Sequence, residues 1–235
     1  MLEIAVFNIQ SALLAAAAGA HRLELCENPY DGGTTPSYGT LKTVREKISI
    51  PVFPIIRPRG GDFLYSDAEY EVICKDVQLC KELGFDGVVI GLLHADGSID
   101  KERTKKLVDL AYPMEVTFHR AFDRAAHPLQ ALEDIIACGC NRILTSGQVP
   151  NAWDGRELIK QLVEKADDRI IIMPGSGVRS SNIKALADFT GAMELHSSAR
   201  MLTPSGMQFQ TKSMQENLQN TIVDTTEIKK MLAAL

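Results

Sequence analysis

The chain has 235 residues and a formal net charge of −5, from 25 basic and 30 acidic residues. Its length suits one large α/β domain, and an acidic balance without a basic block argues against a nucleic-acid partner. The first residues lack the basic and apolar regions of a secretory signal, and the apolar runs are too short to span a bilayer, so no membrane partner is expected. An odd number of cysteines, five, argues against a disulfide framework, and we expect a reduced, cytoplasmic protein.

Eight strand-like runs alternate with helix-like segments along the chain. The runs lie at residues 2–7, 22–26, 52–57, 87–91, 115–119, 141–145, 169–173 and 191–196. This alternation within one uninterrupted domain predicts a closed parallel (β/α)8 barrel, the TIM-barrel fold. A doubly wound open sheet is the alternative, and it would also bind ligands at the carboxyl ends of its strands.

Helix starts carry recognisable capping residues. The run Ser-Asp-Ala-Glu from Ser66 to Glu69 is a capping box, and it predicts a long helix that ends near Gly84. Proline is favoured in the first turn of a helix, and Asp or Ser at its N-cap. These rules predict further helix starts at Pro36, Asp100, Pro128 and Ser180 or Ser181.

The barrel pattern occupies residues 1–205. The segment from Thr203 to Thr221 is polar and rich in Gln and Asn, and the run from Asp224 to Glu227 then begins a short terminal helix. We therefore expect residues 206–235 to form a C-terminal tail. Its helix either packs on the barrel or contributes to a subunit interface.

Several strand-like runs carry ionisable side chains where a buried strand would be apolar. These side chains are Glu3, Glu24, Cys26, Arg57, His119, Glu194 and His196. Side chains alternate faces along a strand, so Glu24 shares a face with Cys26, and Glu194 shares one with His196. Unpaired charges are too costly to bury, so these groups must meet one another, a ligand or water. The pattern predicts a shared polar site at the strand ends, and salt bridges that merely fill the barrel are the alternative.

The residues at the carboxyl ends of the strands are the candidate site, because TIM-barrel active sites form there. The candidate catalytic residues, which would handle protons, are Glu24, His119 and Glu194, with Asp123 as a further acid or base. The candidate substrate- or anion-binding residues are Arg57, Arg59, Arg120, Asp123, Ser146, Gly175, Ser176, Gly177, His196 and Arg200. No Walker loop, nucleophile elbow or dinucleotide fingerprint is present, so no organic cofactor is expected and the reaction class stays open.

The clearest single motif follows the seventh strand. There the sequence Met-Pro-Gly-Ser-Gly-Val-Arg runs from Met173 to Arg179, and Ser197, Ser198 and Arg200 follow the eighth strand. Glycine-rich loops after strands seven and eight commonly hold a phosphate through backbone N–H groups. We expect an anion or phosphate pocket at this place.

Several longer segments resemble the CutC family of copper homeostasis proteins. They cover residues 1 to about 210, and they are 22–26, 32–37, 56–65, 116–123, 144–147, 173–177 and 194–200. The runs from Arg57 to Tyr65 and from Thr117 to Asp123 are the most specific. The resemblance implies a TIM barrel, a cytosolic location, and a homodimer or higher homo-oligomer.

The resemblance also implies Cu(I) binding and a contribution to copper tolerance. Cys26 matches a cysteine of the family and is the residue that would bind Cu(I), whereas Ala5 stands where some relatives have a second cysteine. One thiolate alone is a poor Cu(I) ligand set, so His119, His196, a methionine or a second subunit would have to complete it.

Three hypotheses on function therefore stay open. On the resemblance, the chain is a cytoplasmic copper homeostasis protein with Cys26 as the principal metal ligand. On the residues, it is an enzyme that acts on a small phosphorylated or carboxylated metabolite at the carboxyl-terminal face of the barrel. The third hypothesis is a non-catalytic oligomeric scaffold whose polar lumen is structural.

Overall fold

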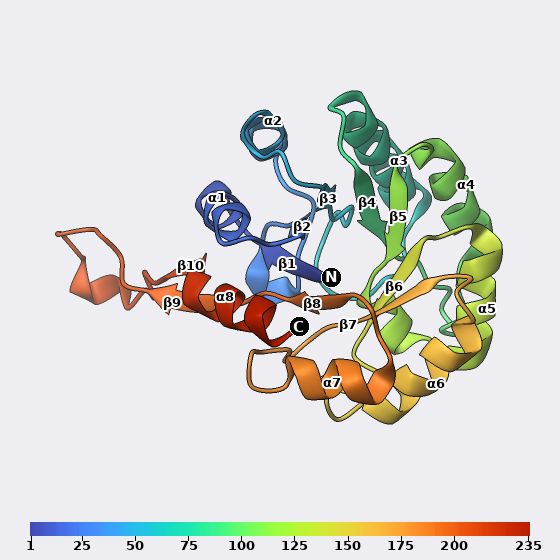
Figure 1. Cartoon of the computed structure of the whole chain (residues 1–235). Helices are drawn as coiled ribbons and strands as arrows, with labels where there is room; N and C mark the ends of the chain where they lie inside the picture. Colours follow the sequence, from blue (N-terminus) through green and yellow to red (C-terminus); the bar gives the residue numbers. More distant parts are fainter.

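A computed structural model of the protein describes the backbone of residues 1–235 and every side chain other than that of Lys212. Eight short parallel strands form the wall of a barrel, with helices on the outside (Figure 1). The strands are β1 (Leu2–Val6), β2 (Arg22–Leu25), β3 (Val52–Pro54), β4 (Gly87–Ile90), β5 (Glu115–Phe118), β6 (Arg142–Thr145), β7 (Ile171–Pro174) and β8 (Leu195–Ser197).

Strand pairing runs around the barrel in two arcs. One arc has the order β3-β2-β1-β8 and the other has the order β4-β5-β6-β7. A parallel bridge between Ile55 and Val89 joins β3 to β4, and β7 lies beside β8 on the other side of the ring (Figure 1). The TIM-barrel prediction is confirmed.

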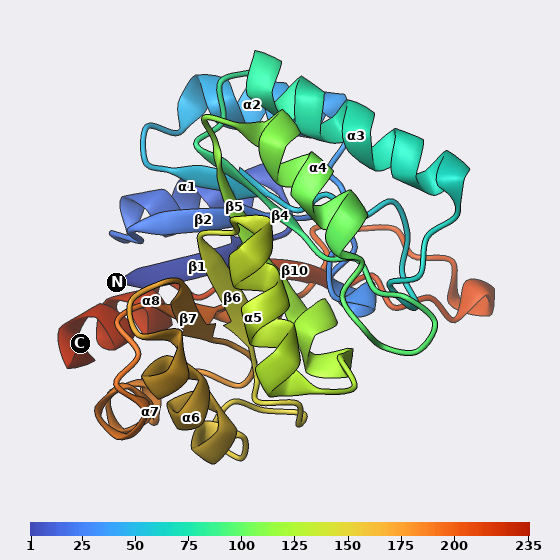
Figure 2. The same cartoon turned by 90° about the vertical axis from the view of Figure 1, so that its right-hand side faces the viewer.

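The helices cover the wall from outside, as the view along the barrel side shows (Figure 2). Outward-facing strand residues such as Ile4, Leu23 and Phe118 are fully buried between strands and helices and form the main apolar core. The helices are α1 (Ile9–Ala17), α2 (Tyr38–Lys47), α3 (Asp67–Glu82), α4 (Lys101–Ala111), α5 (Pro128–Cys138), α6 (Arg156–Ala166), α7 (Ile183–Thr190) and α8 (Thr225–Ala234).

Three of the helix starts predicted within residues 1–205 are confirmed. Ser66 and Glu69 form a reciprocal capping box at the start of α3. The Asp100 side chain accepts a hydrogen bond from the backbone N–H of Arg103 at the start of α4, and Pro128 is in the first turn of α5. Local sequence alone therefore sets these boundaries.

Two predicted helix starts are wrong. Pro36 lies outside α2, because Ser37 is the N-cap and its side chain accepts a hydrogen bond from Thr40. Ser180 does not cap α7, because its N–H and its hydroxyl both donate to Glu227 of α8, and Asn182 takes the N-cap position. A contact distant in sequence thus replaces the local cap.

The C-terminal region contains a hairpin arm and then α8. The arm consists of β9 (Arg200–Thr203) and β10 (Asn220–Val223), which pair in antiparallel fashion, and it extends away from the barrel (Figure 1). Asp224 caps α8 as predicted, and buried Ile228 and Met231 hold α8 between α7 and α1. The division of the chain at residue 205 stays a prediction. Among the described helices, none combines the length and apolar character needed to cross a membrane.

Candidate functional site

Two glycines make room for histidines that point into the lumen. A Cβ atom at Gly91 would lie 2.3 Å from Nδ1 of His119. At Gly175 it would lie 2.4 Å from Leu144 and 3.2 Å from the Cβ of His196. Because the contacts of 2.3 and 2.4 Å are closer than atoms can approach, a side chain at either position would displace His119 or Leu144.

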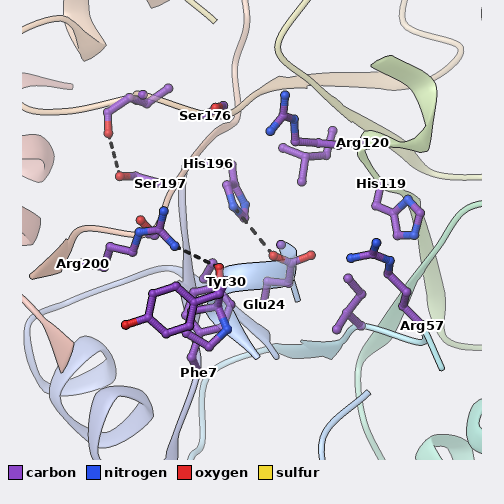
Figure 3. A pocket seen from close by; sticks show the side chains of 18 of the residues that line it. Phe7, Glu24, Tyr30, Arg57, His119, Arg120, Ser176, His196, Ser197 and Arg200 are labelled. Atoms are coloured by element: carbon purple, nitrogen blue, oxygen red, sulfur yellow. Dashed lines mark hydrogen bonds and ion pairs between the residues drawn. The ribbon is translucent and has the colours of Figure 1, made fainter. Parts of the chain in front are cut away.

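A cavity of about 470 Å³ opens at the carboxyl ends of the strands. It lies where the TIM-barrel fold places active sites (Figure 3). Both acidic and basic side chains contribute, together with the loops after β7 and β8. Its polar lining residues are Glu24, Tyr30, Arg57, His119, Arg120, Ser176, Arg179, His196, Ser197, Ser198 and Arg200.

Glu24 and His196 face each other at the floor of this cavity (Figure 3). The Nε2 atom of His196 lies 3.7 Å from a carboxylate oxygen of Glu24. Its Nδ1 atom lies 2.8 Å from a carboxylate oxygen of Glu3, which is fully buried below the cavity. The imidazole therefore lies between two carboxyl groups, of which Glu24 alone lines the cavity.

The two carboxyl groups differ in proton affinity. Burial raises the pKa of Glu24 to about 7, and the nearby Glu3 charge adds to the effect although the His196 charge opposes it. Burial acts in the same direction on Glu3, but the hydrogen bond with His196 and the charge of Arg22 outweigh it and lower the pKa of Glu3 to about 2. Burial would lower the pKa of His196, but Glu3 and Glu24 raise it overall. Near neutral pH, Glu24 is the group of this set that exchanges a proton most readily.

The His119 side chain is neutral, and one of its two ring nitrogens is hydrogen-bonded to the backbone. Its Nδ1 accepts a hydrogen bond from the backbone N–H of Ala121 at 3.1 Å, which leaves the proton on Nε2. Burial, followed by the charge of Arg57, lowers the pKa of His119 to about 3. Nε2 has no partner among the described protein atoms, so His119 carries an unused hydrogen-bond donor beside the cavity.

Arg57 holds the loops of the site together. Its guanidinium donates to the carbonyl oxygens of Asp31, Gly33 and Gly61, at 2.5, 2.9 and 2.9 Å. These bonds join the loop after β2 to the loop after β3. Arg57 therefore lines the cavity with its charge, while most of its donors position the backbone.

The loop after β7 presents free backbone donors to the cavity. Ser176 and Gly177 have φ angles of 81° and 70°, and the Ser176 hydroxyl donates to the carbonyl of Pro150 at 2.7 Å. Within the described residues, the N–H groups of Ser176, Gly177, Val178 and Ser198 make no hydrogen bond with protein atoms. Successive N–H groups in such a turn form a concave site for an anion.

Arg120, Asp123 and Ser146 form a cluster of their own at the edge of the cavity. Asp123 accepts hydrogen bonds from Arg120 at 2.7 Å, from the Thr145 hydroxyl at 2.5 Å, and from the backbone and hydroxyl of Ser146. Arg120 also donates to the Ser146 hydroxyl at 2.7 Å. Of these residues Arg120 lines the cavity, and Asp123 and Ser146 fix its orientation.

Two candidate residues, Glu194 and Arg59, lie away from the cavity. Glu194 faces the lumen like His196 but lies one layer lower, where it contacts Arg22 and Arg142. Arg59 turns outward to Glu69 and Asp62. The alternation of side chains gave the correct face for Glu194, but it carries no information about depth in the barrel.

Cys26 lies just outside the cavity lining in an apolar cluster with Phe53, Ile55 and Val89. Burial and then the Glu24 charge raise the pKa of the Cys26 thiol well above its usual value. Among the described side chains, no group of three or more His, Cys, Asp or Glu residues is arranged to hold a metal ion.

The structure adds residues that the sequence reasoning did not assign to the site. Glu3 was recognised as an ionisable strand residue, but its contact with His196 depends on the pairing of β1 with β8. Tyr30 and Arg179 line the cavity from loops. Arg22 and Arg142 are the first residues of β2 and β6. The ionisable residues at alternate positions after Arg22 could have identified Arg22, but no such pattern follows Arg142.

The fold and the cavity define a TIM-barrel protein with a charged pocket at the carboxyl ends of its strands. The model of the CutC family matches residues 1–201, and the chain belongs to the CutC family. It is 52% identical over 209 residues to a family protein CutC of Chromobacterium violaceum, covering 89% of this chain and 85% of that protein. It is 48% identical over 214 residues to the mouse copper homeostasis protein cutC homolog, covering 91% and 79%.

Solved structures agree with this assignment. A CutC structure from Streptococcus agalactiae superposes with a TM-score of 0.80 at 34% identity, covering 84% of this chain and 98% of that chain. Thiamine phosphate pyrophosphorylase from Pyrococcus furiosus has a TM-score of 0.62 at 13% identity, covering 99% and 93%. The second likeness extends to the fold alone.

Proposed function

We propose that the protein binds a small phosphorylated or carboxylated metabolite at the barrel mouth and carries out acid–base chemistry on it. The observation that supports this most is the presence, in one cavity, of a buried Glu24 with a pKa of about 7 and a set of unpaired backbone donors. A general acid or base works best when its pKa lies near the working pH. The cavity volume of about 470 Å³ is in the range of small-molecule sites.

The anion would bind between the loops after β7 and β8. Ser176, Gly177 and Ser198 offer backbone N–H groups there, and Arg200 supplies a positive charge from the start of the arm. One guanidinium nitrogen of Arg200 donates to the Pro29 carbonyl at 3.2 Å, which directs the side chain across the mouth. Arginine and backbone N–H groups together are a usual combination for phosphate.

Calorimetric titration with inorganic phosphate, followed by a panel of phosphorylated and carboxylated metabolites, tests the proposal. We expect saturable binding that Arg200→Gln weakens about tenfold, the loss of one charge-assisted hydrogen bond. Arg169→Gln is the matched control, because Arg169 pairs with Glu133 outside the cavity lining. Equal affinity in both variants, or no binding of any anion, would contradict the proposal.

Cu(I) binding at Cys26 is the second candidate function. The mouse and human relatives are named copper homeostasis proteins, and the Cys26 thiol contacts the carboxyl group of Glu24. A thiolate is a soft ligand that suits Cu(I). Metal binding here would have to displace the thiol proton, which burial holds tightly, so we expect the affinity to rise with pH.

An anaerobic Cu(I) titration against a competing chelator tests this second candidate. Tight stoichiometric binding that is lost in Cys26→Ser and retained in Cys74→Ser would support it, since Cys74 lies half-buried on α3. Binding that is equally weak in all three proteins would argue against copper as the ligand.

A cytoplasmic location and a homo-oligomeric state belong to the same proposal. All five cysteines are free thiols, as a reducing compartment would keep them. Large apolar side chains are exposed on the arm, including Leu202, Met207 and Phe209. Sedimentation analysis of the intact chain would show a single monomeric species if the oligomeric state is wrong.

A further inference from the structure

A second cavity of about 320 Å³, here called the side cavity, adjoins the cavity that holds Glu24. The two lie side by side, because they share the lining residues Gly32, Arg57, Phe63 and Arg120. The side cavity is bounded by the loops after β2, β3, β5 and β6. It therefore lies away from the loops after β7 and β8, where the first anion would bind.

The charged residues of the side cavity favour an anion. Three guanidinium groups and two carboxylates line it, a net charge of +1, and they belong to Arg57, Arg120, Arg124, Asp31 and Asp123. Asp123 already accepts hydrogen bonds from Arg120 and from the loop after β6. The carboxylates therefore do not neutralise the cavity, and a negatively charged group is favoured in it.

The Arg124 guanidinium has its hydrogen-bond donors free. Arg124 ends the 3-10 helix η2 (Arg120–Arg124), and its side chain is exposed. Its Cζ atom lies over the Phe63 ring, 5.3 Å from the ring centroid. Within the described residues, no carboxylate pairs with Arg124 and no oxygen accepts a hydrogen bond from its side chain. A guanidinium over a ring keeps its in-plane N–H groups available for a planar or tetrahedral anion.

Arg120 is held in place but only partly used. Its Nε donates to Asp123 at 2.7 Å and its Nη2 to Ser146 at 2.7 Å, whereas its Nη1 makes no hydrogen bond with described protein atoms. The Gln148 side chain donates to the carbonyl of Ala125 at 2.6 Å, which ties the end of η2 to the loop after β6. The donors of η2 are thus fixed before any ligand binds, which lowers the entropic cost of binding.

The two anion positions lie on opposite sides of the barrel mouth. In Figure 3, Arg200 lies on one side of Glu24 and His196, and Arg57 and Arg120 lie on the other. A ligand that reached both sides would pass over Glu24. Its middle, and not one of its ends, would then be the part within reach of the Glu24 carboxyl group.

We propose that Arg120 and Arg124 form a second anion subsite in the side cavity, and that the ligand is a small metabolite with an anionic group at each end. The proposal rests on the proposed function for the first anionic group, at Arg200. Arg124 is the specificity-determining residue, because it selects ligands with two anionic groups over ligands with one. A phosphate or a carboxylate suits the second position, since arginine binds either through paired N–H groups.

Calorimetric titration of the full chain with methylphosphonate and with straight-chain bisphosphonates of increasing length tests the proposal. We expect a bisphosphonate of one length to bind about tenfold or more tightly than methylphosphonate, through the added charge-assisted contacts. Shorter members should gain little, because a linker that cannot span the two sites gives no second contact. A parallel series of phosphonocarboxylates shows whether a carboxylate or a phosphonate suits the second position.

Arg124→Gln should abolish this gain and leave the affinity for methylphosphonate unchanged, whereas Arg200→Gln should weaken the binding of every probe. Arg156→Gln is the matched control, because Arg156 also lies over an aromatic ring, 4.6 Å from the centroid of Trp153, but outside the lining of both cavities. We expect it to bind all probes like the wild type.

The possible failures are distinguishable. Arg200-dependent binding of methylphosphonate without a gain in either series, or a gain that persists in Arg124→Gln, would overturn the second subsite and leave the proposed function standing. No binding of any probe would overturn the proposed function, and the second subsite with it.

Discussion

At the amino-terminal end of the lumen, Arg22 and Arg142 both contact Glu194, at 2.7 and 3.0 Å, and Arg142 continues to Glu115 at 2.8 Å. At the carboxyl-terminal end, Glu24 faces His196 at 3.7 Å and a cavity. The first set satisfies each charge with a close opposite charge, whereas the second leaves a carboxyl group poised to change its protonation. The same barrel thus separates charges that hold the wall together from charges that are available to a ligand.

The largest effect should come from breaking the first set, the ion pairs at the amino-terminal end of the lumen, here called the lower set. Arg22→Met leaves Glu3 and Glu194 without a shared partner in a buried position, and we expect the free energy of unfolding to fall by about 3–5 kcal/mol. Urea unfolding measures this. Lys184→Met, which breaks a surface pair with Asp188, is the control, and an equally small loss in both variants would refute the distinction.

In the second set, Glu24 and His196 at the carboxyl-terminal end of the lumen, the stability contribution should depend on pH. The pKa of Glu24 is raised in the folded state, so its contribution is complete below pH 4.5 and is lost as the pH rises through 7. Glu24→Gln removes this loss. From pH 5 to pH 8 we expect the wild-type protein to lose about 2 kcal/mol relative to the variant, measured by urea unfolding. Glu46→Gln should follow the wild type, and parallel curves for Glu24→Gln would contradict the assignment.

His119 should show a pH effect of opposite sign. Its pKa is lowered in the folded state, so its stabilising contribution is present above pH 6.5 and is lost as the pH falls toward 3. Between pH 7 and pH 5.5 we expect the wild-type protein to lose about 1 kcal/mol relative to His119→Gln. The test is again urea unfolding, with exposed His94→Gln as the comparison. A wild-type protein that loses no stability relative to His119→Gln over this range would refute a neutral His119.

The smallest effect is expected at Arg59, which belongs to neither set. Its guanidinium pairs with Glu69 and Asp62 at a surface position. Arg59→Gln should change the free energy of unfolding by less than about 1 kcal/mol and leave phosphate affinity unaltered. A loss of affinity comparable to that of Arg200→Gln would place Arg59 in the site after all.

The sequence was most informative where the signal is local. Alternating polar and apolar residues identified the strands and the inward face of Glu24 and His196, and capping residues located α3, α4 and α8. It was least informative where a contact spans many residues. Three carbonyls from two loops engage Arg57, and Glu227 of the last helix replaces the expected cap at Ser180.

The depth at which a side chain lies in the barrel could not be predicted from the sequence either. Glu194 and His196 share a face and are two residues apart. Glu194 nevertheless belongs to the ion pairs at the amino-terminal end, whereas His196 lines the cavity. Cys26 likewise follows Glu24 by two residues and yet lies among apolar side chains outside the lining. Depth depends on the tilt and stagger of strands, which only the closed barrel defines.

The pairing of β1 with β8 ties the site to the order of synthesis. Glu3 leaves the ribosome well before its partner His196, which is made almost two hundred residues later. No partial chain that lacks β8 contains the Glu3–His196–Glu24 arrangement, however well its earlier strands have folded. The chemistry proposed for the mouth therefore requires a completed ring of strands.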